Sequence, residues 1–323
     1  MSVRPRRRSS RLLRVLWPVC VLAAGLSLPV LSPPAGARSR RVAAPRVHSC
    51  PLFPASDPLN REITHAPVYP NSASYIASIG ANLDLHPDFG TNPSYGIPYL
   101  VVGPRQRKVP VRFTEYGEES DPGPYPIPLS APVEGAGEEG DRHVLTLQSG
   151  SCKLYELYDA RRSASGWEAA SGAVFNLRTG ALRHDGWTSA DAAGLPIMPL
   201  LVRYEEVRAG HIDHALRVTV PRTQAGYIHP ATHYASSSHD RRLPPMGLRL
   251  RLKANFDLSG YHGQALIILR ALERYGLIVA DNGSSWYLTG APDPRWDEND
   301  LQQLKRVPGS AFEAVRSGPI RHD

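Results

Sequence analysis

The hydrophobic and polar positions in the second half of the chain alternate with the period of a β-strand. Residues 211–220 place Ile212, His214, Leu216, Val218 and Val220 on one face. Residues 246–257 place Leu248, Leu250 and Leu252 on one face, and Arg249, Arg251 and Lys253 on the other. Alternation this regular is typical of a strand with one buried face. Shorter apolar runs predict further strands at 97–102, 109–113, 142–147, 152–158, 277–280 and 286–289, with the last two flanking the turn signal Asp281-Asn282-Gly283.

Three segments have the spacing and end signals of helices. One follows Asn71 and Ser72 and ends at Gly80, one covers 264–275, and one begins near Asp297. Residues 115–140 are too rich in proline and glycine for a regular element, and a loop of this length is usually functional or mobile. The whole pattern predicts a mainly β protein, an antiparallel β-sandwich or jelly-roll-like domain with a few peripheral helices.

The first 37 residues have the composition of a secretion signal. They carry six arginines and no acidic residue, followed by an apolar run over 15–31 and the sequence Ala35-Gly36-Ala37. A charged segment, an apolar segment and a small-x-small cleavage site are the three parts of a secretory signal. Prolines interrupt the apolar run, so it falls short of the ~20 residues that a spanning helix needs. We expect cleavage after Ala37, export to the extracellular space and no stable membrane insertion afterwards.

Removal of this segment changes the charge of the protein. The full chain has 37 Lys and Arg against 30 Asp and Glu, and loss of the six arginines leaves 31 against 30, a net charge of +1. We therefore expect no nucleic-acid partner, because no general basic field remains. The expected organisation is a signal peptide at 1–37, a disordered leader at 38–49, one secreted domain at 50–316 and a tail at 317–323.

Two cysteines remain in the processed chain, Cys50 and Cys152. An even number of cysteines in an exported protein indicates a disulfide, and two free thiols are the alternative. In the chain-entropy model a bridge over about 100 residues stabilises the fold by roughly 4–5 kcal/mol.

The chain contains none of the familiar catalytic or nucleotide-binding motifs, so we expect no cofactor and no metal. A first candidate site is the pair His211 and Asp213, which a strand projects to the same face, a spacing that suits a metal pair or an acid–base pair. Arg217 lies farther along that face, either to bind substrate or to form an ion pair with Asp213. Arg249 and Arg251 are candidates for binding an acidic glycan if their face lines a groove, and a solvated sheet surface is the alternative.

Carboxylates beside aromatic side chains are the other candidates. Glu156 lies between Tyr155 and Tyr158, and Asp281 shortly precedes Trp286. Glycan-cleaving enzymes use two carboxylates across a groove, and aromatic rings stack on the sugar. Trp187 and Trp286 are therefore candidate sugar-binding residues. Trp187 lies in the polar segment 186–196, which is either the wall of a binding site or a turn whose tryptophan enters the core.

Several segments together resemble a group of uncharacterised exported bacterial proteins. They are Cys50-Pro-Leu-Phe-Pro, Tyr95-Gly-Ile-Pro-Tyr, Gly140-Asp-Arg-His, Gly186-Trp-Thr-Ser-Ala-Asp-Ala-Ala-Gly, His214-Ala-Leu-Arg, Asp281-Asn-Gly-Ser and Ala291-Pro-Asp-Pro-Arg-Trp. The resemblance covers roughly residues 50–315. It implies secretion and a single domain, and it assigns no catalytic residue because the group has no established activity.

These observations favour a secreted protein that acts on a polysaccharide or cell-wall glycan, as a glycoside hydrolase or a polysaccharide lyase. The alternative is a non-catalytic extracellular carbohydrate-binding or surface protein. Two acidic side chains facing each other in a groove indicate the enzyme, and a flat aromatic platform indicates the binding protein.

Overall fold

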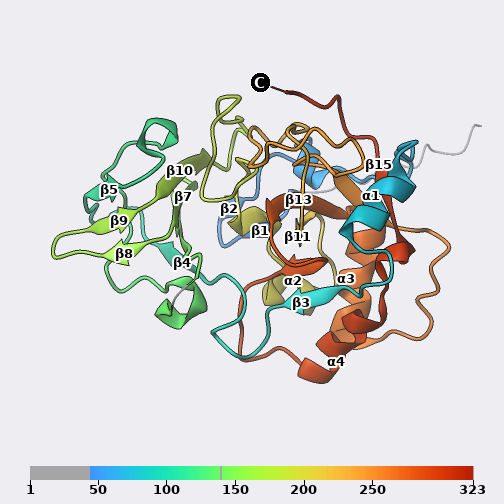
Figure 1. The fold of residues 1–323 in the computed structure, drawn as a ribbon. Coiled ribbons are helices and arrows are strands. Elements are labelled where there is room, and N and C mark those ends of the chain that lie inside the picture. The colour runs from blue at the N-terminus through green and yellow to red at the C-terminus, as the bar shows by residue number, and fades with distance from the viewer. Residues whose placement is uncertain (1–43, 139, 323) are drawn as a thin grey trace, which may run out of the picture. The chain divides into compact units, whose positions relative to one another are not determined.

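The largest sheet of the protein has six strands in the order β15-β12-β13-β11-β14-β3 and mixes parallel with antiparallel pairs (Figure 1). The computed structural model describes residues 44–138 and 140–322, which belong to one unit spanning Val42–Asp323. The expected signal peptide and its cleavage site lie outside the described residues. The six strands are β3 (His86–Asp88), β11 (Leu216–Val220), β12 (Arg249–Leu252), β13 (Leu277–Asn282), β14 (Tyr287–Thr289) and β15 (Phe312–Val315).

Three smaller sheets complete the β structure. The four-stranded sheet has the order β10-β7-β6-β4, the three-stranded sheet β5-β9-β8, and β1 pairs with β2. The strands are β1 (Arg46–Val47), β2 (Cys50–Pro51), β4 (Tyr99–Val102), β5 (Val111–Phe113), β6 (Val144–Gln148), β7 (Lys153–Tyr158), β8 (Arg161–Arg162), β9 (Trp167–Ala169) and β10 (Ser171–Asn176). The helices are α1 (Ser72–Ile79), α2 (Tyr204–Ala209), α3 (Gly263–Arg274) and α4 (Glu298–Gln302).

The structure confirms a mainly β protein with a few short helices, but it does not confirm an antiparallel sandwich or jelly roll. Four strand pairs are parallel: β11 with β13, β14 with β3, β4 with β6, and β5 with β9. The turn signal at Asp281-Asn282-Gly283 predicts a hairpin of β13 and β14, but β11 lies between these two strands. A strand from elsewhere in the chain has taken the position that a local hairpin partner would occupy.

A second difference from the prediction is that both faces of the large sheet are buried. All four residues of β12 are buried, and so are four of the five residues of β11. The regular alternation therefore does not separate a core face from a solvent face in these strands. Residues 211–215, expected as the start of a strand, form an irregular segment between α2 and β11.

The helix predictions agree well with the structure. Gly80 ends α1 in the left-handed conformation, at φ 119°, which a glycine adopts without strain. The Asp297 side chain accepts hydrogen bonds from the backbone N–H groups of Asn299 and Asp300 at the start of α4. The three expected helices therefore correspond to α1, α3 and α4.

The described part of segment 115–140, which was expected to be functional or mobile, packs over a small second core. Tyr125, Ile127 and Ala131 are fully buried there against Trp167, whose Nε1 donates to the Ile127 carbonyl at 3.2 Å. The same segment ends in a short 3-10 turn that begins at Glu134. It is thus an ordered, irregular wall that carries Glu134 toward the four-stranded sheet.

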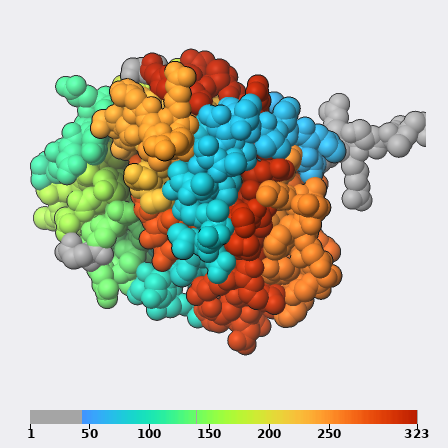
Figure 2. All heavy atoms as spheres, turned by 45° about the vertical axis from the view of Figure 1, so that its right-hand side comes forward, coloured from blue at the N-terminus to red at the C-terminus, as the bar shows by residue number. Residues whose placement is uncertain are grey.

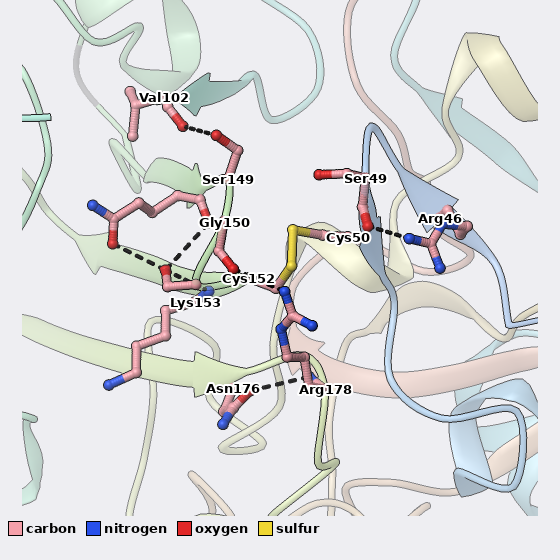
Figure 3. The surroundings of a disulfide bond; sticks show 12 residues. Arg46, Ser49, Cys50, Val102, Ser149, Gly150, Cys152, Lys153, Asn176 and Arg178 are labelled. Carbon is pink, nitrogen blue, oxygen red and sulfur yellow. Dashed lines mark hydrogen bonds between the residues drawn. A yellow bond between two sulfur atoms is a disulfide. The ribbon is translucent and has the colours of Figure 1, made fainter. Parts of the chain in front are cut away.

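The expected disulfide is confirmed between Cys50 and Cys152, whose Cα atoms are 5.3 Å apart (Figure 3). Both residues are fully buried, and the bond ties β2 to the turn between β6 and β7 across 102 positions of sequence. Part of the expected disordered leader is ordered, because Arg46 and Val47 pair with Pro51 and Cys50.

The segment that contains α1 packs along the C-terminal part of the chain. Tyr69 N–H donates to the Ala314 carbonyl at 2.8 Å, and Ala314 N–H donates to Ser72 Oγ at 2.9 Å. Figure 2 shows this blue to cyan segment lying beside the red C-terminal segment on one face of the molecule. The edge strand β15 is thereby covered by a neighbour from the opposite end of the described chain.

Candidate functional site

A pocket of about 270 Å³ opens where the end of β13, the end of β7 and the loop 188–192 meet. Three aspartates, Asp141, Asp191 and Asp281, are among its lining residues, together with Tyr116 and Tyr158. The remaining lining residues are Ser171, Thr188, Ser189, Ala190, Ala192, His233, Ala235 and Asn282. We name it the Asp281 pocket. Segment 186–196, one of whose two expected roles was the wall of a binding site, supplies five of its residues.

Arg217 donates hydrogen bonds to the carboxylates of two of these residues, Asp191 and Asp281. Its Nε and Nη2 donate to the two oxygens of Asp191 at 3.0 and 2.9 Å, and Nη2 also donates to Asp281 Oδ2 at 3.0 Å. Nη1 donates to the hydroxyl of Thr289 at 2.9 Å. Both roles expected of Arg217, substrate binding and an ion pair with Asp213, are therefore wrong: Arg217 points into the core, where its side chain is 5% exposed.

The two carboxylates bound to Arg217 have different environments. The Asp191 side chain is fully buried and takes a two-pronged contact, whereas the Asp281 side chain is 21% exposed and reaches the pocket. Burial raises the pKa of Asp281 above its ordinary value near 4, the charge of Asp191 raises it further, and Arg217 opposes both. Asp281 is thus the acidic side chain that combines access to the pocket with a raised proton affinity.

Asp141 and Asp281 both lie close to the hydroxyl of Tyr158. Burial raises the pKa of Tyr158, and the charges of Asp141 and Asp281 are the next two causes of that increase. Asp141 is exposed and comes from the turn before β6, whereas Asp281 comes from β13. The phenol therefore lies near one exposed and one partly buried carboxylate.

Behind Tyr158, a buried ion pair supports the loop that carries Asp191. His143 Nδ1 is 2.5 Å from Glu134 Oε2, and its Nε2 donates to the Ala190 carbonyl at 2.9 Å. Burial lowers the pKa of His143, but the Glu134 carboxylate more than offsets this, and the pKa rises to about 9. The ring also packs against Tyr158, with centroids 5.6 Å apart. A positively charged His143 thus fixes both the 188–192 loop and Tyr158.

Glu156, expected as a catalytic residue, is fully buried and does not line the pocket. Its carboxylate accepts hydrogen bonds from the backbone N–H groups of Ile197 and Met198 at 2.9 to 3.0 Å. Burial raises the pKa of Glu156 to about 7, although these hydrogen bonds lower it. Its observed role is to hold the turn at 197–198 against β7.

His211 and Asp213 lie together, as expected, but outside this pocket. His211 Nδ1 is 3.2 Å from Asp213 Oδ2, and Tyr275 Oη donates to Asp213 Oδ1 at 3.4 Å. Both residues belong to the irregular segment before β11 rather than to a strand, and His211 is 62% exposed. Neither lines the Asp281 pocket.

The expected cationic wall is wrong, because Arg249 and Arg251 are buried. Arg249 donates to the carbonyl oxygens of Pro58, at 2.9 Å, and Tyr275. Arg251 forms an ion pair with Glu313 at 2.5 Å and donates to carbonyl oxygens of residues 63–66. Both side chains join β12 to neighbouring segments and have no access to a ligand.

The two tryptophan candidates have different positions. Trp286 is fully buried, donates from Nε1 to the Gly80 carbonyl at 2.8 Å and stacks on Phe312, so its expected role as a sugar platform is wrong. Trp187 is half-buried, with its ring 4.8 Å from that of His184. It adjoins Thr188 but does not line the pocket itself.

Comparison of the chain with protein-family models, with curated proteins and with solved structures finds no match. Within residues 44–138 and 140–322, no three His, Cys, Asp or Glu side chains are grouped so that they could hold a metal ion. No helix in this described part of the chain is long and apolar enough to cross a membrane.

Sequence reasoning missed Asp141, Asp191, His143 and Glu134. Asp191 lies in the segment whose composition suggested a binding wall, so a signal was present for it. Glu134 lies in the irregular segment 115–140, and Asp141 and His143 lie at the start of the strand predicted at 142–147. No pattern marked any of the three as functional, and only the fold brings them together.

Proposed function

We propose that this protein is a carbohydrate-active protein and that the Asp281 pocket binds a sugar of a glycan chain. The observation that carries the proposal is that Asp281, which reaches the pocket and has a raised pKa, lines the same pocket as Tyr158. Sugar rings present hydroxyls to carboxylates and apolar faces to aromatic rings, and this pocket supplies both kinds of partner.

The preferred activity within this proposal is glycoside hydrolysis. Asp281 in its protonated form gives a proton to the glycosidic oxygen as the bond to the sugar breaks, and Asp141 is the second carboxylate, which takes a proton from the attacking water. Asp191 is a positioning residue, because both its oxygens are bound by Arg217. A lyase is less favoured, since no Lys or Arg lines the pocket to neutralise a uronate carboxylate.

Binding without cleavage is the second candidate function, and a separate surface favours it. The rings of His86 and Tyr287 stack with centroids 4.1 Å apart in a second pocket of about 470 Å³, beside Tyr95, which is 57% exposed. Such a group of rings is suited to stacking on a sugar chain. In this second function the protein binds a glycan at the pocket beside His86 and Tyr287 without cleaving it.

We also propose that the protein is secreted and is similar to the exported bacterial group whose segments it shares. The composition of residues 1–37 supports export, and the buried disulfide is of a kind that persists in oxidising compartments.

A glycan-array screen combined with a reducing-sugar assay tests the proposed function. Release of reducing ends from any bound glycan supports the hydrolase, and binding without release supports the second candidate. Absence of binding to every glycan on a broad array, by protein with an intact disulfide, refutes both.

A further inference from the structure

One end of the four-stranded sheet carries six exposed cations that come from four segments of the chain. At this end β4 finishes at Val102, β6 at Gln148 and β10 at Asn176, and β7 begins at Lys153. We name this surface the basic end, and its cations are Arg46, Arg105, Arg107, Lys108, Lys153 and Arg178. Figure 3 shows Arg46, Lys153 and Arg178 around the disulfide.

Hydrogen bonds and the disulfide hold these four segments together. Gln148 Nε2 donates to the Pro104 carbonyl at 3.1 Å, and Arg178 Nη2 donates to the Gly150 carbonyl at 2.8 Å. The disulfide joins the turn between β6 and β7 to β2, whose partner strand β1 contains Arg46. The cations are therefore neighbours because of the fold, although they are far apart in sequence.

None of the six cations forms an ion pair with an acidic side chain in residues 44–138 and 140–322. The segments that form the basic end contain no Asp or Glu at all, over 44–56, 89–114, 142–155 and 169–184. Other exposed arginines do have acidic partners, such as Arg112 with Glu168 at 2.7 Å and Arg242 with Asp240 at 2.8 Å. The positive charge of the basic end is therefore available to a partner.

This charge is concentrated rather than a consequence of a basic protein. From residue 38 onward the chain has 31 Lys and Arg against 30 Asp and Glu, so without the six cations 25 remain against 30. Asp57 lies against Gly180, close to the basic end, but its carboxylate accepts a hydrogen bond from the Leu59 N–H at 2.9 Å. A cluster of one sign on a chain with almost no net charge attracts partners of the opposite sign to that place.

We propose that the basic end binds an acidic polysaccharide through its carboxylate or sulfate groups. Four of the six cations are arginines, whose planar guanidinium pairs with such groups through two parallel hydrogen bonds. The ends of four neighbouring strands span roughly 14 Å, a width that favours a polymer over a single small anion. A lipid surface is less favoured, because interfacial binding typically uses a helix with an apolar face, and this end consists of strands and turns.

The basic end is separate from the Asp281 pocket, so this inference does not depend on the proposed catalytic role of Asp281. The strand β7 starts at Lys153 in the basic end and finishes at Tyr158, which lines the pocket. Five residue steps along a strand correspond to about 17 Å. The protein therefore offers an anchoring surface for an acidic chain at one end of the sheet and the pocket at the other.

Isothermal titration calorimetry at pH 7 with polygalacturonate, and with neutral dextran of the same length, tests the inference. We expect polygalacturonate to bind at least about tenfold more tightly than dextran, and about 0.5 M salt to remove this preference by screening. The triple variant Arg105→Gln, Arg107→Gln and Lys153→Gln should bind polygalacturonate at least about tenfold more weakly, because three charged contacts are lost.

The matched control is the triple variant Arg222→Gln, Arg241→Gln and Arg270→Gln, which removes the same charge from exposed positions outside the basic end. It should keep the affinity of the unsubstituted protein for polygalacturonate. An equal loss in both triple variants, or equal binding of dextran and polygalacturonate, overturns the inference. Tighter binding to phosphatidylglycerol vesicles or to double-stranded DNA than to polygalacturonate overturns it as well. Each of these results leaves the proposed role of the Asp281 pocket standing, because turnover by Asp281→Asn tests that role separately.

Discussion

Replacement of Arg217 by Met should lower the free energy of unfolding by more than the loss of an exposed ion pair does. The substitution keeps much of the side-chain volume but removes the guanidinium, which makes four hydrogen bonds to Asp191, Asp281 and Thr289. Asp191, whose side chain is fully buried, then has no cation beside it. Removal of one partner of a buried ion pair typically costs about 3–5 kcal/mol, and we expect a loss in this range.

The assay is urea unfolding followed by tryptophan fluorescence at pH 7. Arg112→Met is the control, because Arg112 and Glu168 form an ion pair whose side chains are 65% and 41% exposed. An exposed pair of this kind contributes only about 0–1 kcal/mol. The double variant Arg217→Met with Asp191→Leu should be more stable than Arg217→Met alone, since the unpaired charge is gone. A loss for Arg217→Met no larger than that for Arg112→Met would refute the reasoning.

Three further predictions concern the rest of the molecule. Reduction of the disulfide should lower the free energy of unfolding by roughly 4–5 kcal/mol, and thiol titration of the folded, unreduced protein should find no reactive thiol. The pKa of His143 is raised from 6.5 to about 9, so its contribution to stability is complete below about pH 6.5 and is lost as the pH rises through 9. Urea unfolding across this pH range should show the loss for the unsubstituted protein but not for His143→Gln. Intact-mass analysis of secreted protein should find Arg38 as the first residue, and recovery of the full-length chain in membranes would contradict cleavage after Ala37.

The positions of most strands and helices could be predicted from the sequence, because local apolar runs and end signals determine them. The pairing of the strands could not. The turn at 281–283 has the sequence of a hairpin, but β11, which begins 61 residues before β13, occupies the position between β13 and β14. Local turn preference is a smaller contribution than the burial of a whole apolar strand.

The burial of the arginines in β12 could not be predicted for a similar reason. Alternation of Arg with Leu is typical of a solvated face, but the carbonyl oxygens that accept hydrogen bonds from Arg249 and Arg251 come from residues 58–66 and Tyr275. Those acceptors are far away in sequence, so the pattern within the strand does not indicate them. Burial of charge is accepted where such partners are supplied.

For the candidate site, a carboxylate near aromatic residues was enough to select Asp281, and a count of two cysteines was enough to predict the disulfide. Arg217 was selected as a substrate-binding residue, with an ion pair to Asp213 as the alternative, and neither role holds because its partners Asp191 and Asp281 are 26 and 64 residues away in sequence. The lining residues around Asp281 and Asn282 come from six other segments, at 116, 141, 158, 171, 188–192 and 233–235, and only the three-dimensional structure brings them together.

The central claim is that Asp281 is the acidic group at which a glycan is bound and cleaved, and one comparison tests it most directly. Turnover of the best glycan from the array screen is measured for the unsubstituted protein, Asp281→Asn and the exposed control Asp240→Asn, together with the melting temperature of each. The account predicts a loss of at least ~100-fold for Asp281→Asn with little change in melting temperature, and no loss for the control. Equal turnover by Asp281→Asn and the unsubstituted protein would contradict it.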